Sequence, residues 1–261
     1  MTRAGGSRAS LAGWLVAALV AAPLLGCASA PRTERSVLAG NPARNLLVLP
    51  LNVAAILPTE LEAARPIVWE ELEIYLRAQG KELKTLSLEA ARRLWVASIQ
   101  EARAADARAG YDEAARVMVG KLSRYAAFDA VIAPSLFVRK ARIAGRSASW
   151  DGVERPLEIE AAERLPADFP LEGVAPGASL HAVVLDPQGN KLEEETIGLE
   201  LLVGVRVIRK RGWSTEEAPS ADGATLEFTP RTEAFASREH LREGIARALA
   251  GFLPPPARAG D

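Results

Sequence analysis

An apolar run of 15 residues near the start of the chain, from Leu11 to Leu25, is the feature that most limits how this sequence can fold. The run follows two arginine residues and leads directly into the only cysteine of the chain, Cys27. This order of basic, apolar and small residues is typical of a secretory signal. The run is also shorter than the roughly 20 residues that a membrane-spanning helix needs. We therefore expect residues 1–26 to be a signal peptide that is removed.

A chain with one cysteine cannot form an intrachain disulfide, so an exported body must be stabilised by its own apolar core. The hydrophobic content of 49% over 261 residues is ample for such a core. The formal net charge is -1, and the short basic clusters of the chain are soon followed by acidic residues. We therefore expect no nucleic-acid partner.

The tetrad Leu24-Leu25-Gly26-Cys27 resembles the bacterial lipobox. In lipobox proteins the thiol takes a diacylglyceryl group, the signal is cut before the cysteine, and the new amine is usually acylated, for example with palmitate. The resemblance implies that Cys27 is the lipidation site, and two or three acyl chains make a durable membrane anchor. Residue 28 is alanine rather than aspartate, which in a Gram-negative cell implies the periplasmic side of the cell outer membrane.

Two alternatives remain for this segment. The sequence Ala28-Ser29-Ala30 has the small-x-small form that the ordinary signal peptidase recognises, although cleavage there would leave Pro31 as a poor first residue. A lone cysteine can also be a small buried apolar residue. The position of Cys27 at the end of the apolar run favours lipidation over both alternatives.

Beyond the signal, the composition divides the chain into three parts. Residues 27–43 show no apolar period and are expected to form a lipidated flexible tether, whose average span as a coil is about 20–24 Å. Residues 44–253 carry periodic patterns and are expected to form a single α/β domain. Residues 254–261 begin with three prolines and are expected to be a disordered tail.

The first half of the predicted domain alternates strands and helices. The continuous apolar run Leu46–Leu51 predicts a strand that is buried on both faces, and residues 81–86 predict a second strand. Apolar residues at helical spacing predict helices over residues 66–79, 87–102 and 112–125.

From Phe128 onward the patterns are those of strands and tight turns. Residues 128–138 predict a strand in which Pro134 marks a bulge or an edge position. The dipeptide Asp151-Gly152 predicts a two-residue hairpin in which Trp150 opposes Val153.

The last third of the domain continues with strands and ends in a helix. Residues 161–178 predict a loop, residues 179–185 a strand, and Asp186–Asn190 a turn that leads into a return strand over residues 191–208. Residues 209–232 are expected to be irregular. Residues 238–252 predict a final helix.

Together these elements predict an α/β (α+β) fold with a single mixed sheet, two or three helices after the first strands, antiparallel hairpins in the second half and a C-terminal helix. The order resembles the periplasmic lipoproteins around the curli secretion channel subunit and the activators of penicillin-binding proteins. The matching residues are Asn45–Pro50, Phe128–Ile132 and Val184–Asn190, and the resemblance covers residues 44–253. It implies non-enzymatic partners in the cell envelope.

On this basis we expect a membrane-anchored, periplasm-facing lipoprotein that acts as a non-enzymatic adaptor or assembly factor. It would bind another envelope protein through a sheet edge or its helices. We expect no cofactor and no metal ion.

An exported hydrolase is a less favoured alternative. Such an enzyme would need one of the two histidines as a general base or metal ligand. We expect His181 on a strand face and His240 on the solvent side of the last helix instead. The acidic run Glu193-Glu194-Glu195 is better explained by a charged face than by an acid/base pair. A deep pocket that holds His181 beside carboxylates would favour this alternative.

A small-ligand or peptidoglycan-binding module is the other alternative. Its candidate contact residues are Trp150 and Trp213, because an exposed indole ring can stack on a sugar. Tryptophan is more often a partly buried core residue. Buried rings would therefore argue against this use of the two residues.

Overall fold

A computed structural model describes residues 43–160, 171–209, 224–231 and 234–253. The predicted signal peptide and tail lie outside these residues, as does the predicted tether except for its last residue. The elements are β1 (Asn45–Val48), the 3-10 helix η2 (Thr59–Leu61), α1 (Ala64–Ala78), β2 (Glu82–Thr85), α2 (Leu88–Ala105), α3 (Tyr111–Leu122), β3 (Ala130–Ala144), β4 (Ser147–Trp150), β5 (Val153–Pro156), β6 (Ile159–Glu160), β7 (Glu172–Leu185), β8 (Lys191–Leu201), β9 (Val203–Arg209), β10 (Ala224–Pro230) and α4 (Arg238–Ala248).

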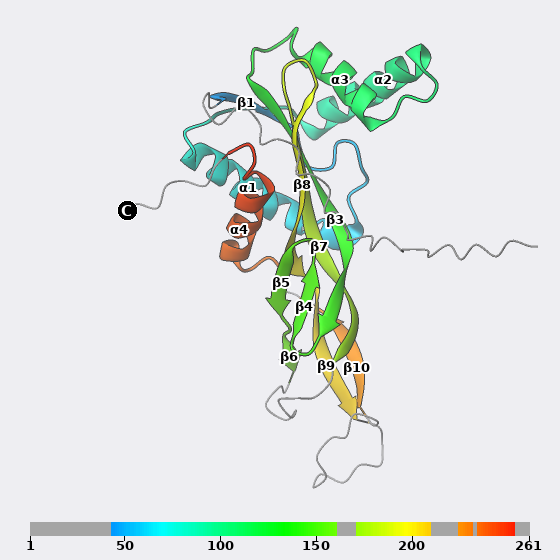
Figure 1. Ribbon diagram of the computed structural model, residues 1–261, viewed down its shortest axis with the longest axis vertical. Helices are drawn as coiled ribbons and strands as arrows, with labels where there is room; N and C mark the ends of the chain where they lie inside the picture. Colours follow the sequence, from blue (N-terminus) through cyan, green and yellow to red (C-terminus); the bar gives the residue numbers. More distant parts are fainter. Residues whose placement is uncertain (1–42, 161–170, 210–223, 232–233, 254–261) are drawn as a thin grey trace, which may run out of the picture. The chain divides into compact units, whose positions relative to one another are not determined.

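These elements confirm the predicted α+β class with a mixed sheet, but the described strands form two sheets rather than the single sheet that was predicted. Strand β1 pairs in parallel with β2 and with β3, because a helical crossover connects each to the next. Strand β3 pairs antiparallel with β7, and β7 with β8, so that the sheet is mixed (Figure 1). The C-terminal helix α4 is present at the predicted position.

Helices cover both faces of this sheet. Leu46 and Val48 of β1 belong to one buried cluster with the inner faces of α1 and α4, and Leu47 belongs to another with α2 and α3. Leu46 and Val48 have no exposed surface, and Leu47 is only 3% exposed. The apolar run that predicted a strand buried on both faces therefore fills the centre of a three-layer arrangement.

Beyond β1, the main sheet continues from β3 to β4 and β5 along one edge and to β7 and β8 along the other, and β10, β9 and β6 form a separate three-stranded sheet. Strand β3 continues past β1 and pairs with β4, and the β4–β5 hairpin turns at Asp151 and Gly152, whose φ angles are 37° and 73°. The carbonyl of Asp151 accepts a hydrogen bond from the amide of Gly198 at 3.0 Å, which joins this hairpin to β8. The predicted pairing of Trp150 with Val153 is confirmed. Two residues with positive φ are what such a turn requires.

At Pro134 the prediction of a bulge is wrong, whereas the alternative of an edge position holds locally, because the pairing of β1 with β3 ends at Val48 and Ile132. Strand β3 is central and pairs with β7 in unbroken register through Pro134. Proline has no amide hydrogen, but no hydrogen bond of the sheet is lost at Pro134 because β1 has already ended. Asn52 takes the place of β1 beside β3. The Asn52 side chain accepts a hydrogen bond from the amide of Leu136 at 2.9 Å and donates one to its carbonyl at 3.0 Å.

Three further boundaries differ from the predictions. Residues 172–178, expected in a loop, are the first half of β7 and pair with the long extension of β3. The return strand is divided at Leu202 into β8 and β9. Residues 224–230, expected to be irregular, form β10, which pairs antiparallel with β9. Each of these strands is stabilised by a partner that is distant in sequence, which local patterns do not reveal.

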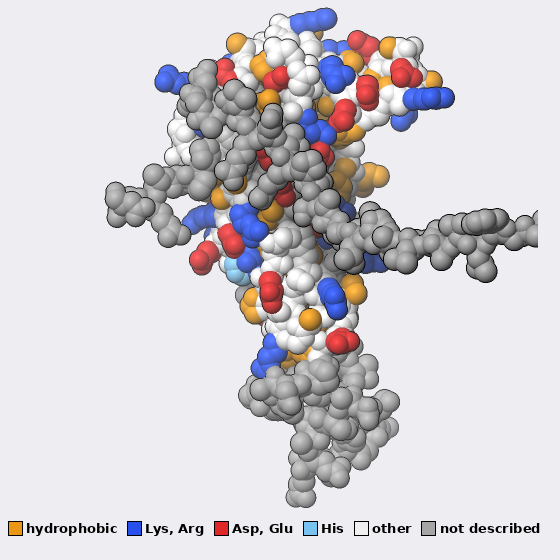
Figure 2. Space-filling view, in the orientation of Figure 1, with side chains coloured by type: hydrophobic (Ala, Val, Ile, Leu, Met, Phe, Trp, Pro, Cys, Tyr) orange, Lys and Arg blue, Asp and Glu red, His pale blue; other side chains and the backbone are white. Residues whose placement is uncertain are grey.

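Among the described residues, no helix is long and apolar enough to cross a membrane. Figure 2 shows one face of the molecule, on which basic and acidic side chains are intermixed and hydrophobic ones lie mostly apart from one another.

Candidate functional site

An open cleft of about 480 Å³ lies between the start of α3, the loop after β1 and the outer face of β3, β7 and β8. This volume is within the range of small-molecule sites, roughly 300–1,000 Å³. Its lining combines charged, polar and aromatic side chains. The lining residues are Ala54, Ala55, Gly110, Tyr111, Asp112, Glu113, Ser135, Phe137, His181, Lys191 and Glu194.

The strand register places the polar residues of the cleft in one row. Ser135 of β3 is the cross-strand partner of His181 of β7, which is in turn the partner of Thr196 of β8. Side chains two residues apart on a strand share a face, so Phe137 and Glu194 lie beside this row. The expectation that His181 is a strand-face residue is therefore correct, and the structure adds that this face lines a cleft.

Both ring nitrogens of His181 have neighbours on β8. Its Nδ1 atom lies 2.9 Å from Thr196 Oγ1, and its Nε2 atom lies 3.5 Å from Glu194 Oε1. Burial lowers the pKa of His181 below its ordinary value of 6.5, and Glu194 opposes this shift. The imidazole is therefore mainly neutral at pH 7. It lies beside a carboxylate, as the hydrolase alternative requires, but in an open cleft rather than the deep pocket that would favour that alternative.

Lys191 holds the two walls of the cleft together. Its Nζ atom lies 2.6 Å from Glu194 Oε2 on its own strand and 3.3 Å from Asp112 Oδ1 at the start of α3. The hydrogen bond to Glu194 raises the pKa of Lys191, and Asp112 raises it further. Burial, with the charges of Glu194 and Asp112, raises the pKa of Tyr111. At pH 7 the cleft therefore contains one ammonium, a neutral phenol and carboxylates.

The floor of the cleft leads to a small apolar pocket. The pocket has a volume of about 20 Å³, shares Ala54, Tyr111 and Ser135 with the cleft, and continues to Trp95 and Met118. The ring of Tyr111 packs on Trp95 with 5.2 Å between centroids. The pocket has room for a group of about the size of one water molecule or methyl group beside the polar contacts of the cleft.

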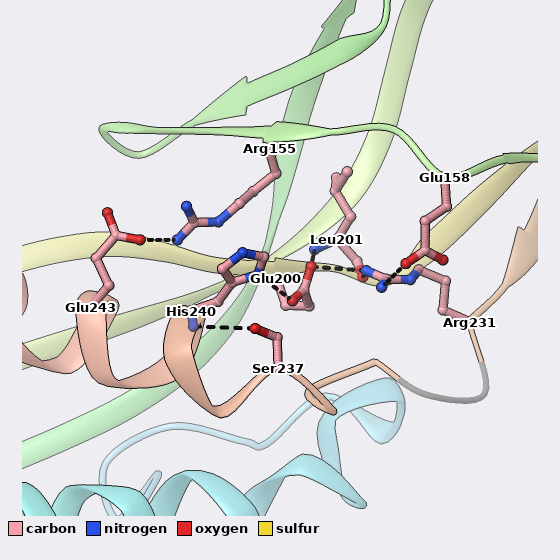
Figure 3. Close-up of polar contacts among 8 residues, drawn as sticks. All are labelled: Arg155, Glu158, Glu200, Leu201, Arg231, Ser237, His240 and Glu243. Atoms are coloured by element: carbon pink, nitrogen blue, oxygen red, sulfur yellow. Dashed lines mark hydrogen bonds and ion pairs between the residues drawn. The ribbon is translucent and has the colours of Figure 1, made fainter. Parts of the chain in front are cut away.

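A second polar cluster, shown in Figure 3, surrounds the buried carboxylate of Glu200. Glu200 Oε1 accepts a hydrogen bond from Arg231 Nη1 at 2.8 Å and one from the amide of Leu201 at 3.1 Å. Its Oε2 atom lies 3.0 Å from His240 Nδ1. Arg231 also pairs with Glu158. His240, expected on the solvent side of its helix, instead has a half-buried side chain with a buried partner.

This second cluster is best explained as a structural connection. Arg155 of β5 pairs with Glu243 of α4 at 2.9 Å, and Ser237 caps α4 by accepting a hydrogen bond from the amide of His240 at 3.4 Å. Glu71 of α1 likewise contacts Arg242 of α4 at 2.8 Å. The paired charges attach α4 to β5, to β8 and to α1.

The candidate contact residues and the lipidation site lie elsewhere. Trp150 is 6% exposed, and its Nε1 atom donates a hydrogen bond to the carbonyl of Ala178 at 3.2 Å, which fits a core residue. Trp213 and Cys27 lie outside the described residues. Among the residues that are described, no group of three or more His, Cys, Asp or Glu side chains could hold a metal ion.

Sequence patterns did not identify the cleft. Of its charged residues, Asp112 and Lys191 were placed only at element ends, and Glu194 was assigned to a charged face. Alternation along β8 separates Glu194, which faces the cleft, from Glu193 and Glu195 on the opposite face. That alternation is a signal that could have identified Glu194.

The chain was compared with known protein families and with curated proteins, and it matches none of them.

We expect the ring of His181 to titrate with a midpoint below 6.5, and the midpoint to fall further in Glu194→Gln, because the carboxylate that favours the imidazolium is lost. Nuclear magnetic resonance of the histidine ring protons measures both midpoints. Glu195→Gln makes the same charge change on the other face and should shift the midpoint much less. A midpoint above 6.5 in the parent protein would contradict the expectation.

Proposed function

We propose that this chain is a membrane-anchored, periplasm-facing lipoprotein that acts, without catalysing a reaction, as an adaptor or assembly factor in the cell envelope. The observation that carries the proposal is the tetrad Leu24-Leu25-Gly26-Cys27 at the end of a short apolar run. In a Gram-negative cell the anchor would lie in the outer membrane. The resemblance to the lipoproteins around the curli secretion channel subunit supports a role in binding other envelope proteins.

The edge of the sheet offers a route to such binding. Strand β2 pairs only with β1 among the described strands, and three of its four residues are exposed. Its outer backbone groups are available for an extended segment of another protein, a common mode of recognition. Recovery of a specific envelope protein with this chain after crosslinking and detergent extraction would support the adaptor role. Recovery of the chain alone would count against it.

The anchor has its own test. Mass spectrometry of the mature protein is expected to find a diacylglyceryl group on Cys27 at the new N-terminus, and Cys27→Ser is expected to lose the lipid and the membrane association completely. Ala28→Asp is a matched control that keeps the acceptor thiol. It should retain the lipid and move the protein from the outer to the inner membrane fraction. A soluble parent protein that begins at Pro31 would refute the proposal.

A second candidate function is a small-ligand-binding module, which the cleft at His181 favours. Its volume, its mixture of charged and aromatic side chains and its apolar floor are features of small-molecule sites. The buried ring of Trp150 does not contribute to this cleft. Calorimetric titration with small aromatic compounds of different charge tests this candidate, which requires that at least one of them binds saturably.

A further inference from the structure

The charges that line the cleft at His181 are unequal. Three carboxylates, those of Asp112, Glu113 and Glu194, face one ammonium, that of Lys191. The Glu113 carboxylate is already the acceptor for the amide of Gly110 at 2.9 Å, which caps α3. Two arginines lie near this lining: the charge of Arg116 acts on Glu113, and Arg139 is paired with Asp151 at 3.5 Å. Asp112 and Glu194 then share the single ammonium of Lys191, so that an excess of one negative charge remains beside it. Such an excess attracts cations and repels anions.

The cleft already binds one ammonium group in the geometry that a ligand would need. Lys191 Nζ lies between Glu194 and Asp112, at 2.6 and 3.3 Å. Hydrogen bonds between an ammonium and a carboxylate are among the strong ones in proteins. An anionic ligand would have to draw Lys191 away from both carboxylates, whereas a cationic ligand adds to or replaces it.

The ring of Phe137, which lines the cleft, has the guanidinium of Arg139 beside it. The guanidinium carbon of Arg139 lies 5.7 Å from the ring centroid of Phe137, within the range of a cation–π interaction. Tyr111 contributes a second ring, and the apolar pocket beneath it extends to Trp95. The cleft thus combines carboxylates, two aromatic rings and a small apolar recess.

We propose that this cleft is a binding site for a small organic amine, in which a positively charged nitrogen contacts Glu194 and Asp112 and an apolar or aromatic body lies against Tyr111 and Phe137. The proposal rests on the second candidate function, ligand binding, and names its substrate class. It is independent of the adaptor role and of the lipid anchor.

The test is isothermal titration calorimetry at pH 7 of the full chain in detergent with benzylamine, benzoate and benzyl alcohol, which share a ring and differ in charge. Titration into detergent alone corrects for partition into micelles. Benzylamine is expected to bind saturably and at least about tenfold more tightly than benzoate, because each charge-assisted contact contributes roughly that factor. Benzyl alcohol should bind with intermediate or undetectable affinity.

Variants then locate the site. Glu194→Gln is expected to weaken benzylamine binding by about tenfold, since it removes one charged contact. Glu195→Gln changes the net charge equally on the opposite face of β8 and should alter the affinity by less than about twofold. Lys191→Met frees Glu194 and Asp112 from their internal ammonium and is expected to increase the affinity for benzylamine.

The possible results separate the two proposals. If benzoate or benzyl alcohol binds more tightly than benzylamine, the amine proposal is wrong and ligand binding stands. If none of the three compounds binds, the amine proposal and the ligand-binding function on which it rests are both wrong. Equal losses in Glu194→Gln and Glu195→Gln would also overturn the proposal, because they would place the amine outside the cleft.

Discussion

Replacing Glu200 with alanine is expected to lower the free energy of unfolding by about 3 kcal/mol, because it removes the buried carboxylate that Arg231 contacts and leaves Arg231 with the exposed carboxylate of Glu158 as its counter-charge. The Glu200 side chain is 5% exposed and that of Arg231 17% exposed. The substitution would also remove the acceptor of His240. Urea unfolding followed by circular dichroism measures the change.

Two comparisons make this prediction specific. Glu89→Ala removes a fully solvated partner of Arg93, with side chains 79% and 74% exposed, and should cost less than about 1 kcal/mol. The double variant Glu200→Leu with Arg231→Met should be more stable than Glu200→Leu alone, since it also removes the mostly buried guanidinium that has lost its buried partner and keeps only the exposed Glu158. Equal costs for Glu89→Ala and Glu200→Ala would contradict the explanation.

The elements that the sequence predicted well are those whose signals are local. The Asp151-Gly152 turn was predicted together with its strand pairing. Aspartate and glycine tolerate the positive φ angles that a two-residue hairpin turn needs, so the dipeptide alone indicates the turn. Helix α2 was predicted to begin at residue 87, and the hydroxyl of Ser87 caps it by accepting a hydrogen bond from the amide of Ala90. Such signals act within a few residues and do not depend on the rest of the fold.

The strand predictions that were wrong share a different cause. Gly173, Pro176 and Gly177 are typical of a loop, yet they lie in β7 because the extension of β3 supplies a complete partner strand. Strand β10 was missed for the same reason, since its partner β9 stabilises it. Pairing between distant segments overrides local propensity.

The candidate site illustrates the same limit. His181 was correctly assigned to a strand face, but its neighbours Lys191 and Tyr111 come from another strand and from a helix, and only the packing of α3 against the sheet brings them together. Glu200 had no local signal, because a carboxylate between Leu199 and Leu201 on a strand predicts a solvent-facing side chain rather than a buried one with charged partners. The identity of those partners did not follow from any pattern.

The ring of Trp150 provides the second prediction of large effect, and it bears on whether this residue is a contact or a core residue. Trp150→Ala is expected to lower the free energy of unfolding by about 3–5 kcal/mol, the usual cost of truncating a large buried aromatic side chain. The ring lies directly over Gly177. A Cβ atom added at Gly177 would come within 2.7 Å of Trp150 Cε2, closer than atoms in a folded protein approach.

Gly177→Ala alone is therefore expected to cost about 1–3 kcal/mol through overpacking. In the Trp150→Ala background the same substitution should be close to neutral, because the atoms that it would meet are absent. The coupling between the two positions, obtained from a double-mutant cycle of urea unfolding, should exceed about 1 kcal/mol. Gly120→Ala in α3, where a new Cβ atom meets nothing within 4 Å, is the control and should stabilise the protein slightly. If Trp150 served instead as an exposed ligand contact, Gly177→Ala would have the same effect in both backgrounds, and Trp150→Ala would leave the stability almost unchanged.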